Sequence, residues 1–167
     1  MFGSVRNGVS AMILLNILWP TFALVLLAFI VLFTTAARRL AHVRRVPPGP
    51  GTFATRDTAA AYFAPVELSA NNLSNLFEMP VLFFALVPLL VETRSAGVAQ
   101  VLLAWLFVLA RAAHSYVHIV RQDVRARFRV FLVSNALLSA MWTGFFIDMA
   151  RAAHAYTQAM GAAGVQP

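Results

Sequence analysis

The sequence predicts an all-α polytopic membrane protein, a single domain over residues 1–167 built as a bundle of four transmembrane helices. Three observations support this class. The 167 residues are 60% hydrophobic and only 11% charged, whereas about a quarter of the residues in a soluble domain are charged. Four long apolar runs follow one another, each near the length of about 20 helical residues that a bilayer core requires. Arginines gather in two of the connections between the runs.

The apolar runs place the expected helices at about residues 11–37, 68–91, 96–120 and 130–149. The first run carries no charge and is too long for a signal peptide. Its arginine pair, Arg38 and Arg39, also follows the run, whereas a signal peptide has its positive charge ahead of the apolar region. The first run therefore predicts a transmembrane helix.

The connections differ in length. The longest covers residues 38–67, and within it VPPGPG (46–51) cannot be helical because Pro and Gly break a helix. The stretch TRDTAAAYF (55–63) predicts a short interfacial helix. VETRSAG (91–97) is short, so the second and third transmembrane helices are expected to be antiparallel neighbours.

Arginine placement predicts the orientation. Nine arginines flank or occupy the first and third connections, and three lie on the opposite side: Arg38, Arg39, Arg44, Arg45, Arg56, Arg121, Arg125, Arg127 and Arg129 against Arg6, Arg94 and Arg151. Cytoplasmic connections of membrane proteins carry the excess of positive charge, so these two connections are expected in the cytoplasm and both termini outside. The arginines flank membrane helices and lack a soluble recognition motif, which argues against nucleic-acid binding.

Polar residues enter the second apolar run on one side. Asn71, Asn75, Glu78 and Leu82 are spaced i, i+4, i+7 and i+11, which is one face of a helix. Pro80 removes a backbone donor two residues after Glu78 and frees the carbonyl of the residue four positions earlier. A freed carbonyl at membrane depth is tolerated where it lines a cavity or finds a partner.

The third run carries a second polar stripe. Arg111, His114, Ser115 and His118 are spaced i, i+3, i+4 and i+7, and ionisable residues at membrane depth usually face the bundle interior or a wet cavity. The two stripes are expected to face each other, with Glu78 and Arg111 as a candidate ion pair. A purely structural interpretation, in which this pair only fixes the helix register, stays open.

The two histidines also invite a metal interpretation. His114 and His118 are four residues apart, as are the helical ligands of some zinc sites. The chain has no cysteine and no HExxH motif, and a positive Arg111 one turn away opposes a cation. No metal site is therefore expected, and the histidines are expected to form hydrogen bonds across helices.

Two segments carry a resemblance to a known family. NNLSNLFEMPVLFFAL (71–86) and ARAAHSYVHIVRQDVRARF (110–128) resemble the MAPEG family, the membrane-associated proteins in eicosanoid and glutathione metabolism, and most closely its bacterial branch. The resemblance covers roughly residues 15–147. It implies a homotrimer of four-helix protomers, in which many members bind glutathione between neighbouring subunits near the cytoplasmic side. It also implies the inner membrane of a bacterium.

The resemblance implies roles for residues of the first two helices. Asn75 and Glu78 match residues that contact the glutathione backbone, with Glu78 at the amino end of the peptide. Arg38 matches loosely an arginine that meets a glutathione carboxylate. Two positions depart from the eukaryotic pattern, because Asn71 stands where those enzymes have Arg and Met79 where some have Tyr.

The resemblance also covers the third helix and the start of the fourth. Arg111, His114 and Ser115 match the helix 3 motif, and His118 stands where eukaryotic enzymes often have Tyr. Arg127 matches the arginine that stabilises the glutathione thiolate, which makes it the expected catalytic residue. A free thiol has a pKa near about 8.5, and a nearby guanidinium lowers it.

Two functions follow as hypotheses. The first is a glutathione-dependent membrane transferase or peroxidase that acts on a lipophilic electrophile arriving from the lipid bilayer. The alternative is a non-catalytic MAPEG-like membrane protein, or an accessory subunit of a larger membrane complex. Arg127 and His114 favour the enzyme, whereas Asn71 favours the alternative.

Overall fold

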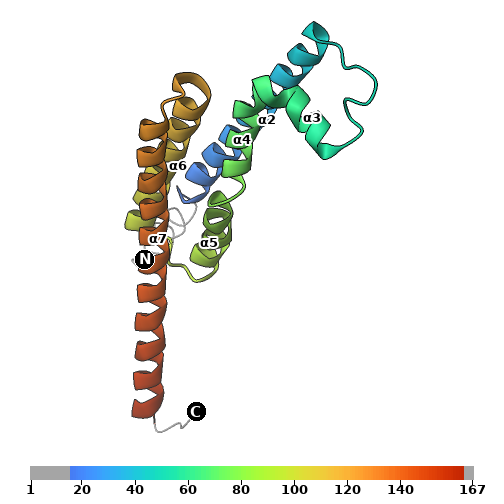
Figure 1. Cartoon of the computed structure of the whole chain (residues 1–167). Helices are drawn as coiled ribbons and strands as arrows, with labels where there is room; N and C mark the ends of the chain where they lie inside the picture. The colour runs from blue at the N-terminus through green and yellow to red at the C-terminus, as the bar shows by residue number, and fades with distance from the viewer. Residues whose placement is uncertain (1–15, 164–167) are drawn as a thin grey trace.

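The computed structural model describes residues 16–163, and all regular secondary structure in this part of the chain is helical (Figure 1). Four helical stretches in it are long and apolar enough to cross a membrane. The predicted class, an all-α membrane protein with four transmembrane helices, is confirmed. The elements are α2 (Leu18–Arg45), α3 (Arg56–Phe63), the 3-10 turn η1 (Ala64–Val66), α4 (Glu67–Leu76), α5 (Pro80–Glu92), α6 (Val98–Tyr116), the π-helical turn η2 (Val117–Arg121) and α7 (Val124–Ala162).

Helix α2 extends eight residues beyond the apolar run that predicts it, while residues 11–15 of that run lie outside the described part of the chain. It ends at Arg45. The next residue, Val46, precedes Pro47, and a residue before proline is pushed out of the helical region. An apolar run predicts only the part of a helix that lies at membrane depth. The charged end of α2 therefore lies outside the predicted bounds.

The connection after α2 folds back on that helix instead of forming an open loop. The short helix expected after VPPGPG is present as α3, and Thr55 caps it by accepting a hydrogen bond from the Thr58 backbone N–H. Arg39 of α2 forms a salt bridge with Glu67 at 3.2 Å and lies over the Phe63 ring at 4.9 Å from its centroid. These contacts fix the start of α4 against the end of α2.

The second membrane span is broken in the middle. Helix α4 ends at Leu76, α5 begins at Pro80, and Phe77, Glu78 and Met79 between them are not helical. Pro80 has no backbone N–H, and its ring clashes with the carbonyl of the residue four positions earlier in a continuous helix. The prediction of one continuous helix over residues 68–91 is therefore wrong at this point.

The third span ends in a wider turn than an α-helix has. The backbone N–H of Gln122 donates to the Val117 carbonyl at 2.8 Å, five residues earlier, which closes the π turn η2. Gln122 itself is left-handed, with φ 55°. The chain then reverses sharply into α7.

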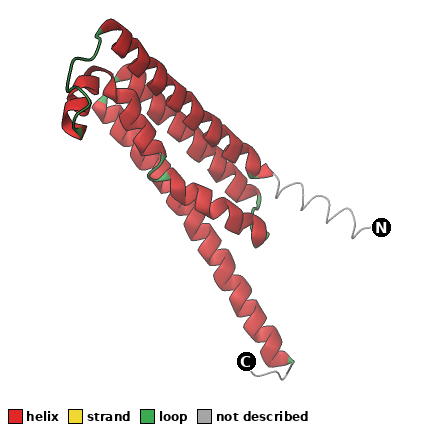
Figure 2. Cartoon of the chain, turned by 90° about the vertical axis from the view of Figure 1, so that its right-hand side faces the viewer, coloured by secondary structure: helices red, strands yellow, loops and turns green. Residues whose placement is uncertain are grey.

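Helix α7 is longer at both ends than the expected residues 130–149. Its start is capped by Asp123, whose Oδ1 accepts hydrogen bonds from the backbone N–H groups of Arg125 and Ala126 at 2.9 and 3.0 Å. It runs for 39 residues to Ala162 and projects past the other helices (Figure 2). Alanine, which favours the helix most, is frequent after residue 149, so the helix continues where the apolar run stops.

The apolar core joins α2, α5, α6 and α7. Its central members are Leu24, Phe83, Leu86, Leu90, Ala104, Phe107, Leu138 and Met141. Phe83 and Phe107 are stacked, with ring centroids 5.1 Å apart. Large apolar side chains on the outer faces of the bundle, such as Phe33 and Leu109, are exposed, as lipid-facing residues are in a membrane protein.

The connections lie at opposite ends of the bundle. The α2–α3 connection and the α6–α7 turn share one end, and the α5–α6 turn lies at the other (Figure 1). The arginine-rich parts of the sequence are therefore together at one end, where the polar cavity described below also lies.

Candidate functional site

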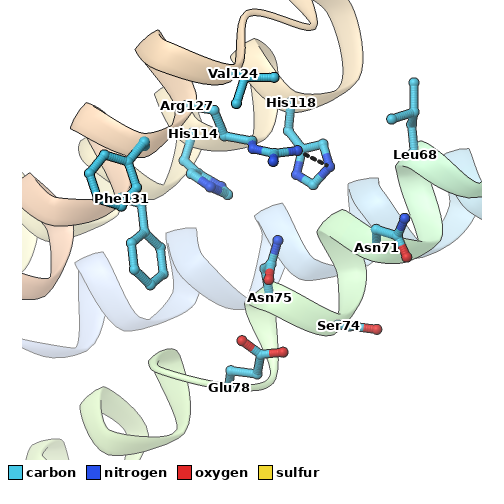
Figure 3. Close-up of a pocket in the computed structure, with 11 residues that line it drawn as sticks. Leu68, Asn71, Ser74, Asn75, Glu78, His114, His118, Val124, Arg127 and Phe131 are labelled. Atoms are coloured by element: carbon cyan, nitrogen blue, oxygen red, sulfur yellow. Dashed lines mark hydrogen bonds between the residues drawn. The ribbon is translucent and has the colours of Figure 1, made fainter.

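A cavity of about 600 Å³ opens between α4 and the α6–α7 turn (Figure 3). It is lined by Leu68, Asn71, Ser74, Asn75, Glu78, His114, His118, Val124, Arg127, Phe128 and Phe131. Polar side chains from the second, third and fourth spans thus meet across one space. Five of the eight residues expected at the site, Asn75, Glu78, His114, His118 and Arg127, are among the lining residues.

One wall comes from the second span. Asn71 lies one turn before Ser74 and Asn75 on α4, and Glu78 follows on the break before α5 (Figure 3). Asn71, Ser74 and Glu78 are exposed in the single chain, whereas Asn75 is half-buried. The cavity is therefore open on the α4 side.

The opposite wall is basic and more deeply buried. His114 and His118 are 2% and 4% exposed, and their rings meet edge to face with centroids 5.7 Å apart. Nη1 of Arg127 lies 3.3 Å from Nε2 of His118 in a hydrogen bond (Figure 3). The guanidinium thus lies at the cavity, on the side opposite Glu78.

Arg111 does not form the expected ion pair with Glu78. Among the residues the structure describes, the only salt bridge is the one between Arg39 and Glu67. Arg111 is fully buried, and its Nη2 donates a hydrogen bond to the backbone carbonyl of Asn75. The break after Leu76 explains the difference, because it turns Glu78 toward the cavity while the guanidinium bonds to the backbone of α4.

Two other expected site residues lie outside the cavity lining. Ser115 is 4% exposed, and its hydroxyl has no hydrogen-bond partner in the described part of the chain. Arg38 is half-buried on α2. Neither touches the cavity of its own chain.

Several residues that line the cavity are not among the predicted site residues. Ser74 lies three positions after Asn71, and Phe128 and Phe131 follow Arg127 by one and four positions, so helical spacing offered a signal for Ser74 and Phe131. Serine and phenylalanine are common in membrane helices for other reasons, and without the cavity they do not stand out.

Buried side chains at the cavity and behind it keep free hydrogen-bonding capacity. Buried atoms without a partner among residues 16–163 include Nδ1 of His114, Nδ1 of His118, both amide atoms of Asn72, and Nε and Nη1 of Arg111. Buried polar groups are normally satisfied, so these atoms leave unused hydrogen-bonding capacity at this end of the bundle. The same residues include no group of three His, Asp or Glu placed to hold a metal ion.

Four helices long enough to span a membrane and a polar cavity at one end of the bundle define an integral membrane protein. The model of the MAPEG family matches residues 17–147. The chain belongs to the MAPEG family, and is thus a membrane protein of eicosanoid and glutathione metabolism. No curated protein and no solved structure matches it. The family match includes every residue that lines the cavity and ends inside α7.

Proposed function

We propose that this protein is a glutathione-dependent membrane transferase or peroxidase that acts on a lipophilic electrophile. The observation that supports it most is the position of Arg127, which lines the cavity opposite Asn75 and Glu78. A positive group suited to a thiolate and a carboxylate suited to an ammonium group thus share one space. We place the protein in a bacterial inner membrane, with this end of the bundle in the cytoplasm.

The cavity fits a charged tripeptide in size and polarity. Its volume of about 600 Å³ falls within the range of roughly 300–1,000 Å³ that is usual for small-molecule sites. In the proposed complex, Glu78 accepts hydrogen bonds from the amino end of glutathione and Asn75 contacts the peptide backbone. His114 and His118 line the opposite wall near the sulfur.

Arg127 supplies the chemistry. Its guanidinium stays charged at any working pH, so it stabilises the thiolate without titrating itself. In a transfer reaction the thiolate sulfur forms a bond to the electrophilic carbon, and the electron pair of the broken bond leaves with its group. In a peroxidase reaction the thiolate attacks one oxygen of a hydroperoxide. The O–O bond breaks to give an alcohol and a sulfenic acid, and a second glutathione converts the latter to disulfide and water.

We further propose that the site is completed by assembly into a homotrimer. The α4 wall is exposed in the single chain, as Asn71 and Glu78 show, which leaves a side for a neighbouring copy to cover. Arg38 does not line the cavity of its own chain. Its expected contact with a glutathione carboxylate is therefore assigned to the cavity of a neighbouring subunit.

The test compares three arginines of α7. Arg125 and Arg129 lie beside Arg127 in sequence but line a separate surface hollow, outside the main cavity. We expect Arg127→Ala to abolish the ultraviolet absorbance of bound glutathione thiolate, whereas Arg125→Ala and Arg129→Ala retain most of it. Loss of about one pKa unit, or about 1.4 kcal/mol, reduces the thiolate population about tenfold. Equal behaviour of all three variants contradicts the proposal.

One observation favours the second candidate, a non-catalytic protein or accessory subunit of a larger complex. Asn71 lines the cavity at the position where eukaryotic members have an arginine, so the α4 wall offers no cation to a carboxylate. This candidate predicts no thiolate band in the wild-type protein at saturating glutathione. The same absorbance experiment therefore decides between the two.

A further inference from the structure

The hydrogen bond between His118 and Arg127 fixes the protonation of the histidine. A guanidinium has only N–H donors, so Nε2 of His118 must be the acceptor and must carry no proton. In the neutral ring the proton then sits on Nδ1, which is buried and has no partner in the described part of the chain. His118 is therefore a neutral acceptor that holds one edge of the Arg127 guanidinium.

The local backbone is built to bring these two residues together. The π turn η2 (Val117–Arg121) inserts an extra residue into the end of the third span, and single π turns of this kind occur frequently at functional sites. The left-handed residue Gln122 reverses the chain, and Asp123 caps α7. The backbone N–H of Arg127 then donates to the Asp123 carbonyl at 2.9 Å, in the first turn of α7.

His118 and Arg127 differ in how deeply their side chains are buried. His118 is 4% exposed, so its ring is fixed by packing, and the His114 ring meets it edge to face. Arg127 is only half-buried and has a long flexible stem that adopts many rotamers in water. Arg125 and Arg129, on the same helix, have no hydrogen bond from their guanidinium groups to another described residue.

We propose that His118 is a positioning residue, which holds the guanidinium of Arg127 toward the cavity before a thiol binds. The inference rests on the proposed function, since the held charge matters only if a thiolate forms there. A guanidinium already oriented toward the sulfur stabilises the thiolate at no reorganisation cost. Without the tether, Arg127 divides its time between the cavity and the cytoplasmic surface, and its effect on the thiol weakens.

The first experiment examines the tether without any ligand. The full chain with ¹⁵N-labelled histidine, reconstituted in lipid nanodiscs, gives signals from its four histidines, and loss of one signal in His118→Gln assigns His118. We expect an unprotonated Nε2 whose shift changes in Arg127→Ala but not in Arg125→Ala. A protonated Nε2, or a shift that ignores Arg127→Ala, overturns the inference.

The second experiment measures the pH at which bound glutathione becomes a thiolate. We expect His118→Phe to move this midpoint up by about one unit, a tenfold loss of thiolate, toward the value of about 8.5 for a free thiol. His118→Gln keeps an acceptor and is expected to restore most of the wild-type midpoint. His154→Phe, on the exposed end of α7, is the matched control and leaves the midpoint unchanged.

The outcomes separate this inference from the function on which it rests. If the wild type shows no thiolate at all, the proposed function is overturned and the role of His118 with it. If the wild type forms a thiolate that His118→Phe leaves unchanged, only the positioning role is overturned. If His118→Phe fails to fold, the midpoint of His118→Gln is compared with those of the wild type and Arg127→Ala. A midpoint at the wild-type value supports the positioning role, and a midpoint at the Arg127→Ala value overturns it.

Discussion

The centre of the bundle and its arginine-rich end are built from the same helices but satisfy opposite requirements. At the centre, Phe83, Leu86 and Phe107 are completely buried and fill the space between α5 and α6. At the arginine-rich end, α4 and the α6–α7 turn leave a cavity of about 600 Å³. The first region is closed by packing, and the second is held open by polar groups.

The backbone is regular at the centre of the bundle and irregular at the cavity. Helices α5 and α6 are regular where they pack on each other, apart from Pro88 within α5. The break before Pro80 and the π turn η2 both lie at the cavity, one on each side of it. Irregular backbone at membrane depth is tolerated where it lines a cavity. We therefore expect substitutions at the centre to change the stability of the fold and substitutions at the cavity to change ligand binding.

The largest expected effect is at the centre. Phe107→Ala removes a ring stacked 5.1 Å from that of Phe83, and we expect it to lower the free energy of unfolding by about 3–5 kcal/mol. Unfolding in detergent, followed by circular dichroism, measures this. Phe33→Ala is the control, because Phe33 is 66% exposed and faces lipid. A loss as large for Phe33 as for Phe107 contradicts the assignment of the core.

A smaller effect, on binding and not on stability, is expected at Glu78. The side chain lines the cavity, is exposed in the single chain and forms no salt bridge among the described residues. Loss of a charge-assisted hydrogen bond costs about 1.5–3 kcal/mol, so Glu78→Gln should raise the Kd for glutathione at least about tenfold. The Tm is expected to stay near the wild-type value.

Glu67→Gln is the matched control for Glu78→Gln. It loses the salt bridge with Arg39. Both side chains of this pair are partly exposed, and such pairs contribute at most about 1 kcal/mol to stability. Its glutathione binding, measured by calorimetry, should equal that of the wild type. If Glu78→Gln loses stability in proportion to binding, then Glu78 has a structural role and the comparison between the two regions fails there.

The smallest expected effect concerns the cap of α7. The hydrogen bond from the backbone N–H of Ala126, together with that from Arg125, lowers the pKa of the Asp123 carboxyl below its ordinary value. A carboxyl with a lowered pKa in the folded state stabilises the fold above its unfolded pKa. This contribution is lost as the pH falls below about 4 and the folded group takes up a proton.

Two variants test this cap. Asp123→Ala should lower the Tm slightly at neutral pH, whereas Asp123→Asn, an equally good helix cap, should keep it and should lose less on acidification. Thermal unfolding at neutral pH and near pH 3 measures both. If acid lowers the Tm of Asp123→Asn as steeply as that of the wild type, then Asp123 does not cause the loss of stability at low pH.

The sequence predicted those features that depend on composition and simple spacing. Long uncharged runs predict membrane spans whatever the details of packing, and the spacing of Asn71, Asn75 and Glu78 correctly places them on one wall. The same spacing predicts a shared face for His114 and His118. These inferences assume the geometry of a regular helix, and they hold although Glu78 lies on the break before Pro80 and His118 in the π turn η2.

Features that depend on irregular backbone were not predicted. Pro80 signalled a freed carbonyl, but whether a proline bends or breaks a helix depends on its neighbours in space. No residue pattern distinguishes the π turn around His118 from an α-helix. The expected Glu78–Arg111 pair does not form for this reason, since its prediction assumes a regular helix where α4 breaks before Pro80.

Helix α7 is a single continuous helix that is long enough to cross the bilayer core and to extend beyond it. At about 1.5 Å per residue, its 39 residues span about 58 Å, nearly twice the bilayer core of about 30 Å. Arg127 lies in its first turns and Ala162 at its far end, and no break separates them. The protruding end and the guanidinium at the cavity are therefore parts of one continuous helix, so a displacement of one end is transmitted along its backbone toward the other.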